Sequence, residues 1–232
     1  MPASRRETVG LRALVFDFDG LIVDTETPAY HAWQELYRRH GQELPLELWA
    51  QVIGTHEVRF DAMEHLEKLH GEALDRDALH ADRNVHKTAL TDAQPLLPGV
   101  RELVEDAGAR GIKLGVASSS HHPWVEGHLR RRGILDAFTC ICCREDVQLT
   151  KPHPDLFLAS LQCLGVGPAE AVVFEDSPNG ILAARAAGIY AVAVANPITA
   201  QLDLSAADLQ LPSLAARPPS ELLAELEARL PA

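Results

Sequence analysis

Long apolar runs are missing from this sequence, and basic residues are scarce. The densest basic run, 130–132, lies at the end of a predicted helix, where interaction with the helix dipole explains it better than a binding patch. No apolar run approaches the ~20 residues that a membrane-spanning helix needs, and no signal-peptide stretch follows the two arginines near the N-terminus. Lysine and arginine together number 21, against 33 aspartates and glutamates. A surface with that balance repels nucleic acid and anionic lipids. We therefore expect a cytoplasmic protein with no nucleic-acid or membrane partner, and a monomer by default.

Cysteine is also scarce, with four residues at positions 140, 142, 143 and 163. Their spacing matches no zinc-site pattern. Three of the four fall in the apolar run 138–143, which we expect to be a buried strand. We therefore predict that all four are free, buried and reduced thiols, as is typical of cytoplasmic proteins.

What the sequence does contain is a series of short apolar runs separated by helical patterns. The runs cover 11–16, 112–117, 138–143, 171–174 and 190–194. Runs of this length suit strands buried on both faces. Their alternation with helices predicts an α/β fold with a Rossmann-like, three-layer core around a parallel sheet. Right-handed crossovers would place the carboxyl ends of all strands at one edge, where such folds bind ligands.

One stretch, from about residue 25 to residue 95, contains no convincing strand. Apolar residues recur there at helical spacing in three groups, within 29–37, 46–53 and 58–69. We expect an α-helical domain inserted between the first strand and the rest of the sheet. The predicted division is a core of residues 1–24 and 95–232, and an inserted domain of residues 25–94.

Two carboxylates stand where the first predicted strand ends, in the segment Asp17-Phe18-Asp19-Gly20. Carboxylates two residues apart at a turn can point into one small space, and both stay charged there only beside a cation. Mg²⁺ prefers oxygen ligands and is often held by one or two carboxylates together with a substrate phosphate. Taken alone, the pair is equally consistent with an ordinary acidic turn.

Three later segments strengthen the case for a binding site. The second apolar run leads into Ser118 and Ser119, whose hydroxyl and free backbone N–H groups suit either a phosphate cradle or a helix cap. Lys151 lies between two sheet elements and is followed by prolines at 152 and 154. The fourth run leads into Glu175 and Asp176, which supply further metal ligands. Because all would lie at the ligand edge, they indicate a phosphate-and-metal site.

This ordered set resembles the haloacid dehalogenase superfamily of phosphotransferases, from residue 11 to about residue 230. The segment 17–26 (DFDGLIVDTE) looks like the first motif of that superfamily, and Ser118, Lys151 and Glu175-Asp176 match the second, third and fourth. The insertion directly after the first motif is similar to the cap domain of the β-phosphoglucomutase-like branch. The segments 151–157 (KPHPDLF) and 175–180 (EDSPNG) are also typical of that branch.

The resemblance implies a role for each matching residue. Asp17 would attack phosphorus and become phosphorylated, while Asp19 would protonate the leaving group and then activate the hydrolytic water. Ser118, Lys151 and the backbone N–H of Ser119 would hold the transferring phosphoryl group. Such transfer needs mainly in-line positioning and neutralisation of charge.

The resemblance also implies a Mg²⁺ cofactor. Asp17, Asp176 and the backbone carbonyl of Asp19 would hold the ion, with Glu175 binding it directly or through water. The expected function is hydrolysis of a small phosphorylated metabolite, a phosphate monoester of the sugar phosphate or phosphoglycolate type. Candidate specificity residues in the cap are Tyr30, Thr55, His56 and Glu57.

Three alternatives compete with a phosphatase. A sugar-phosphate mutase of the same branch would use a cap histidine and a cap arginine, but the aligned positions hold Ala29 and Glu57. His31 or Arg59 could replace them only with a shift of register. A dehalogenase or phosphonate hydrolase would not need Asp19. A catalytically silent binding protein would be expected to have lost at least one of the motif residues, and all are present.

Overall fold

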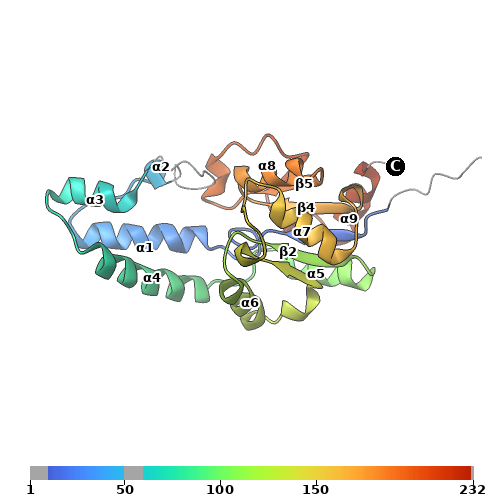
Figure 1. Ribbon diagram of the computed structural model, residues 1–232, viewed down its shortest axis with the longest axis horizontal. Helices are drawn as coiled ribbons and strands as arrows, with labels where there is room; N and C mark the ends of the chain where they lie inside the picture. Colours follow the sequence, from blue (N-terminus) through green and yellow to red (C-terminus); the bar gives the residue numbers. More distant parts are fainter. Residues whose placement is uncertain (1–9, 50–59, 231–232) are drawn as a thin grey trace, which may run out of the picture.

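Six parallel strands form one sheet at the centre of the molecule (Figure 1). The computed structural model describes residues 10–49 and 60–230. The strands lie in the order β3-β2-β1-β4-β5-β6. Their bounds are β1 Ala13–Phe16, β2 Lys113–Ala117, β3 Cys140–Cys142, β4 Ala171–Glu175, β5 Tyr190–Val194 and β6 Leu209–Leu211.

The first strand of the chain occupies the middle of this sheet. Phe16, the last residue of β1, is in register with Val116 of β2 on one side and Phe174 of β4 on the other. All four residues of β1 are buried, which explains its continuous apolar sequence. The residues that directly follow β1, β2 and β4 therefore emerge side by side at one edge of the sheet.

Helices cover both faces of the sheet, as the alternating pattern predicts. The core helices are α5 Val100–Ala109, α6 His122–Arg131, α7 Asp155–Leu164, α8 Pro178–Ala186 and α9 Pro219–Arg229. Single 3₁₀ turns lie at Leu135–Ala137, Arg144–Asp146, Pro168–Glu170, Thr199–Gln201 and Leu214–Ala216. Leu14 and Phe16 pack in one cluster with α5, α6 and α9, whereas Ala13 and Val15 pack in another with α7 and α8.

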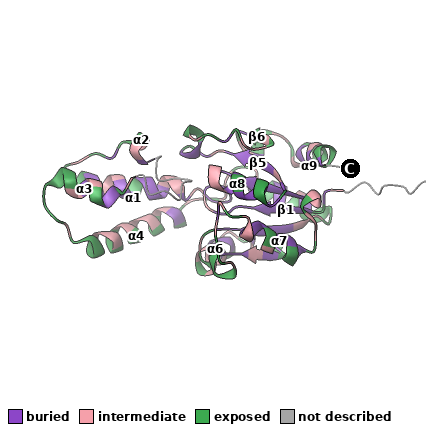
Figure 2. Cartoon of the chain, turned by 45° about the horizontal axis from the view of Figure 1, so that its top comes forward, coloured by how far each residue is buried: buried purple, intermediate pink, exposed green. Residues whose placement is uncertain are grey.

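The insertion after β1 consists of helices, and α1 and α4 run side by side away from the sheet (Figure 1). Its helices are α1 Glu26–Arg39, α2 Leu46–Trp49, α3 Ala62–His70 and α4 Arg76–Asp92. They share an apolar cluster in which Trp33, Leu36, Tyr37 and Leu66 are buried, and Ile198 from the segment after β5 also packs in it. Helix α4 is exposed or half-buried along most of its length (Figure 2). Its sequence therefore shows no strong apolar stripe like the one that predicted α1.

The structure corrects two expectations about the far ends of the sheet. Strand β6 was not predicted, because only three residues pair there. The prediction of four free thiols is wrong for two of them, since Cys140 and Cys163 form a disulfide. Helix α7 packs against β3 and brings these two residues together, which their spacing in the sequence does not reveal. Cys142 and Cys143 are free and buried.

The sequence predicts no membrane-spanning helix, and the helices that the structure describes bear on this point. None of them combines the length and the apolarity that crossing a membrane requires.

A pair of leucine substitutions tests the placement of the core. Leu103 of α5 is fully buried, whereas Leu158 on α7 is 45% exposed. Leu103→Ala should lower the free energy of unfolding by about 2–5 kcal/mol, because it removes buried apolar contacts and leaves a cavity. Leu158→Ala should change it by less than about 0.5 kcal/mol. Denaturant titration of both variants measures the difference, and equal losses would contradict this packing.

Candidate active site

Lys151 lies at the centre of the polar cluster beyond the ends of β1, β2 and β4. Its ammonium donates hydrogen bonds to Asp17 Oδ1, to the carbonyl of Ala117 at 2.7 Å and to Glu175 Oε1 at 2.6 Å. The side chain is only 6% exposed. Burial alone would lower the pKa of this lysine, but the two carboxylates outweigh that effect and raise the pKa. Lys151 is therefore held as a cation.

Three buried carboxylates converge on the same point. Asp17, Glu175 and Asp176 each offer an oxygen, and these oxygens lie within 4.8 Å of one another. Burial raises the pKa of Asp17 to about 8 despite the attraction of Lys151, and burial also raises the pKa of Asp176. Among the described residues, Lys151 is the one cation shown in contact with this group. A buried set of oxygen ligands with excess negative charge fits a divalent cation such as Mg²⁺.

Glu175 is fixed in place by the chain around it. Its Oε2 accepts hydrogen bonds from the backbone N–H groups of Asp176 and Ser177, at 3.0 and 3.1 Å, and from the Ser177 hydroxyl at 3.0 Å. A Cβ atom at Gly180 would lie 1.7 Å from Glu175 Oε1, so only glycine lets α8 begin so close. Because Lys151 takes Oε1, both oxygens of Glu175 already have protein partners.

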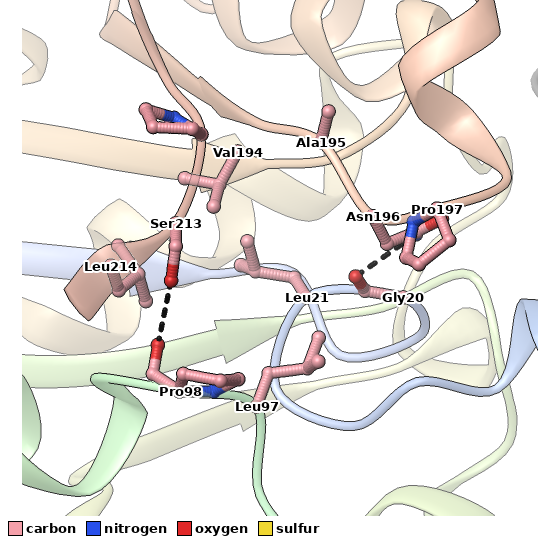
Figure 3. A pocket seen from close by; sticks show the side chains of 11 residues that line it. Gly20, Leu21, Leu97, Pro98, Val194, Ala195, Asn196, Pro197, Ser213 and Leu214 are labelled. Carbon is pink, nitrogen blue, oxygen red and sulfur yellow. Dashed lines mark hydrogen bonds between the residues drawn. The ribbon is translucent and has the colours of Figure 1, made fainter. Parts of the chain in front are cut away.

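Asn196, which sequence analysis missed, joins two parts of the site. Its amide donates to Asp176 Oδ2 at 2.7 Å. The same amide donates to the carbonyl of Gly20 at 3.1 Å (Figure 3). Gly20 has φ +79°, and a Cβ atom there would lie 2.2 Å from Asp176 Oδ2. Asn196 follows β5 at the same edge of the sheet as the other polar residues. That position is the signal by which it could have been found.

Asp19 is held by the loop and helix that follow β2. Ser120 Oγ donates to Asp19 Oδ2 at 2.6 Å, and the indole N–H of Trp124 donates to Asp19 Oδ1 at 2.9 Å. The hydroxyl of Ser118 is 3.4 Å from the same Oδ2 atom. Ser118 is buried, whereas Ser119 is exposed in the same loop. Sequence analysis did not identify Trp124, because it lies within α6 and not at a strand end.

The cap candidates lie apart from this cluster or outside the described residues. Tyr30 is buried in the apolar core of the insertion, and its hydroxyl donates to the carbonyl of Leu44 at 2.9 Å. Its suggested contact with substrate stays a prediction. Thr55, His56 and Glu57 lie outside the described residues.

A cavity of about 280 Å³ lies behind the turn that carries the first motif (Figure 3). Gly20 and Leu21 line one side of it, and Leu97 and Pro98, where the chain returns from the insertion, line another. Ser213 Oγ donates to the carbonyl of Pro98 at 3.3 Å across this region. The first-motif turn and the return segment thus border one mainly apolar space.

The crowding of carboxylates predicts an unusual dependence of stability on pH. Because the pKa of Asp17 is raised in the folded protein, the folded state binds more protons than the unfolded state between about pH 4 and pH 8. Metal-free protein should therefore lose stability as the pH rises through that window. Asp17→Asn should raise the free energy of unfolding at pH 8 by of order 2 kcal/mol.

Chemical unfolding in EDTA at pH 5 and pH 8 measures this difference. Asp136→Asn is the matched control, because Asp136 is exposed and precedes β3, whereas the cluster follows the carboxyl ends of the strands. The prediction would be contradicted if the free energy of unfolding of metal-free wild type rose from pH 5 to pH 8, by the same amount as in Asp17→Asn.

Comparison with known proteins agrees with this geometry. The family model described as haloacid dehalogenase-like hydrolase matches residues 11–188. The Bacillus subtilis protein YhcW, which carries the name of a phosphatase, is 42% identical over 205 residues, covering 88% of this chain and 93% of that protein. The fructose-1-phosphate phosphatase YqaB of Escherichia coli is 34% identical over 182 residues, covering 78% of this chain and 95% of that protein.

Solved structures agree as well. The β-phosphoglucomutase of Clostridium difficile superposes with a TM-score of 0.71 at 26% identity, covering 94% of this chain and 97% of that one. The fold class predicted from the sequence, a Rossmann-like core with an inserted helical cap, is therefore confirmed. From its family model and from relatives that match it along most of their length, this chain belongs to the haloacid dehalogenase-like hydrolases.

Proposed function

We propose that this enzyme is a Mg²⁺-dependent phosphatase that hydrolyses small phosphate monoesters through a phosphorylated Asp17. The observation that carries the proposal is the position of Lys151, buried between Asp17 and Glu175 with Asp176 beside them. A nucleophilic carboxylate, a fixed cation and a set of metal ligands then share one edge of the sheet. Phosphoryl transfer needs this combination of positioning and positive charge.

The residues present fit a Mg²⁺ ion. Asp17, Asp176 and the backbone carbonyl of Asp19 would hold it. Both oxygens of Glu175 are already bound by protein groups, which favours contact through water over direct ligation. When bound, the ion supplies positive charge that offsets the charge of the phosphoryl oxygens. Asn196 orients the Asp176 carboxylate from outside the metal shell.

The reaction follows from the same residues in two halves. In the first, a carboxylate oxygen of Asp17 attacks phosphorus in line, the bond to the leaving oxygen breaks, and Asp19 gives that oxygen a proton. In the second, Asp19 takes a proton from water as the water attacks phosphorus, and the bond from phosphorus to Asp17 breaks, which releases phosphate and restores the Asp17 carboxylate. Lys151, the Ser118 hydroxyl and the backbone N–H of Ser119 would hold the phosphoryl oxygens in both halves.

The helical insertion would act as a cap over this site, with residues 25–94 as the moving part. Its two connections to the core run together, because Val23 forms an isolated bridge with Leu96 and the N–H of Leu97 donates to the carbonyl of Ile22 at 2.9 Å. A paired connection of this kind suits a hinge that excludes water during the first half-reaction. The cytoplasmic location and the monomeric state expected from the sequence stay predictions.

A sugar-phosphate mutase is the second candidate, favoured by the likeness to a β-phosphoglucomutase. Ala29, at the position of the expected cap histidine, is buried in α1 and has no group that transfers a proton. The neighbouring His31 is exposed. These observations support hydrolysis over transfer to a second hydroxyl.

A panel of phosphate esters tests the substrate class. Sugar monophosphates or phosphoglycolate should be hydrolysed with kcat/KM at least about tenfold above their bisphosphate counterparts. In the sequence, Glu57 stands at the position where a mutase would carry an arginine for the second phosphate, and a carboxylate there would repel that phosphate. Phosphate release should depend on added Mg²⁺ and stop in EDTA. A clear preference for bisphosphates would refute the assignment of the substrate class.

Substitution of the nucleophile tests the covalent route. Asp17→Asn should lower turnover by about 10⁴-fold or more, because the amide is nearly isosteric but a poor nucleophile. Circular dichroism should show an unchanged fold. Asp75→Asn, at the N-cap of α4, is the control, since asparagine caps a helix as well as aspartate. Retained activity of Asp17→Asn would exclude a phosphorylated Asp17.

A further inference from the structure

Three hydrogen bonds reach the Asp19 carboxylate, and the longest of them runs 3.4 Å from the Ser118 hydroxyl to Oδ2. Two shorter ones fix the carboxylate, one on each oxygen. Ser120 Oγ donates to Oδ2 at 2.6 Å, and Trp124 Nε1 donates to Oδ1 at 2.9 Å. One donor comes from the loop before α6 and the other from the first turn of that helix. Donors on opposite oxygens restrict rotation of the carboxylate about its Cβ–Cγ bond. The direction in which Asp19 presents a proton therefore depends on α6.

The ring of Trp124 also contacts the cap. The ammonium of Lys87, which lies on α4, is 4.8 Å from the centroid of the Trp124 ring, a distance typical of a cation–π contact. On its own helix, Trp124 packs edge-on against the buried His128 ring at a centroid distance of 4.2 Å. Trp124 thus contacts a cap residue while its N–H contacts Asp19 in the core.

We propose that Trp124 is a positioning residue for Asp19. Through its contact with the Trp124 ring, Lys87 makes this positioning depend on whether the cap is open or closed. The proposal rests on the proposed function, in which Asp19 exchanges protons with the leaving group and with water. An acid/base group acts efficiently only when it is held within hydrogen-bond reach of the reacting oxygen. In the closed enzyme, the contact between Lys87 and the Trp124 ring would keep the indole N–H directed at Asp19.

The first half-reaction gives this role a distinctive signature. As the bond from Asp17 to phosphorus forms and the bond from phosphorus to the leaving oxygen breaks, Asp19 delivers its proton to that oxygen. An alkoxide leaving group needs the proton, whereas p-nitrophenolate departs without it. Misplacement of Asp19 should therefore lower kcat/KM, which reports the first half-reaction, much more for alkyl phosphates than for aryl phosphates. A general loss of structure should lower kcat/KM for both equally.

The test compares wild type with Trp124→Phe on glycerol phosphate and on p-nitrophenyl phosphate, both with saturating Mg²⁺. Phenylalanine keeps an aromatic ring but lacks the N–H donor. We expect kcat/KM for glycerol phosphate to fall at least about tenfold more than kcat/KM for p-nitrophenyl phosphate. Ser120→Ala removes the donor to the other oxygen and should show the same selectivity between the two esters. It replaces Trp124→Phe as the test variant if Trp124→Phe does not fold.

Trp49→Phe is the matched control. The indole N–H of Trp49 has no hydrogen-bond partner within the part of the chain that the structure describes, and the ring is buried in the cap core. This variant should keep the ratio of the two kcat/KM values. Equal losses on both substrates in Trp124→Phe and Ser120→Ala would overturn the positioning role.

A double-mutant cycle tests the link to the cap. Lys87→Met keeps the length of the side chain and removes its charge, so it should shift the ratio of kcat/KM values in the same direction as Trp124→Phe. It should add less than about a twofold further shift in the Trp124→Phe background, because both changes act on one contact. Lys68→Met, at an exposed site on α3, is the control.

The outcomes separate the proposals. Fully additive effects of Lys87→Met and Trp124→Phe would overturn the link to the cap. Wild type that hydrolyses neither ester with Mg²⁺ would overturn the proposed function, and this inference with it. The inference alone would be overturned if wild type hydrolysed both esters and neither Trp124→Phe nor Ser120→Ala lost more activity on glycerol phosphate than on p-nitrophenyl phosphate.

Discussion

The buried contact of Lys151 with Asp17 and Glu175 is the interaction on which the rest of the site depends. Carboxylates taken out of water lose hydration, and their mutual repulsion adds to that loss. Lys151 offsets part of this cost, but the raised pKa values of Asp17 and Asp176 show that it does not offset all of it. The remaining negative charge would suit the cluster to the divalent cation that we propose, and through that cation to a phosphate.

The geometry around this contact is set by the backbone more than by long side chains. The parallel register of β1 with β2 and β4 brings Asp17, Ser118 and Glu175 to one edge. Gly180 allows α8 to start against the Glu175 carboxylate, and Gly20 allows the first-motif turn to pass beside Asp176. A single methyl group at either glycine would occupy space that a carboxylate oxygen now fills.

The sequence predicted those parts of the structure that depend on local pattern. Buried strands such as β1 and β4 appear as unbroken apolar runs, and polar residues at their ends mark the ligand edge. The disulfide between Cys140 and Cys163 and the bond from Trp124 to Asp19 were not foreseen, because each depends on how a helix packs against a distant strand or turn. Helix α4 was also missed as a separate element. Its half-buried face carries polar groups such as Arg83 and Lys87, which a search for apolar stripes passes over.

The central place of β1 has a consequence for the order in which the molecule is assembled. During synthesis β1 is made before the whole helical insertion, and its two neighbours in the sheet, β2 and β4, follow only after that insertion. The insertion has its own apolar core, so it can become compact while β1 still waits for both partners. Pairings between segments so distant along the chain form slowly. An apolar strand that stays unpaired is prone to aggregation. Early compaction of the inserted helices beside β1 would reduce how long, and how openly, the strand is exposed to other chains.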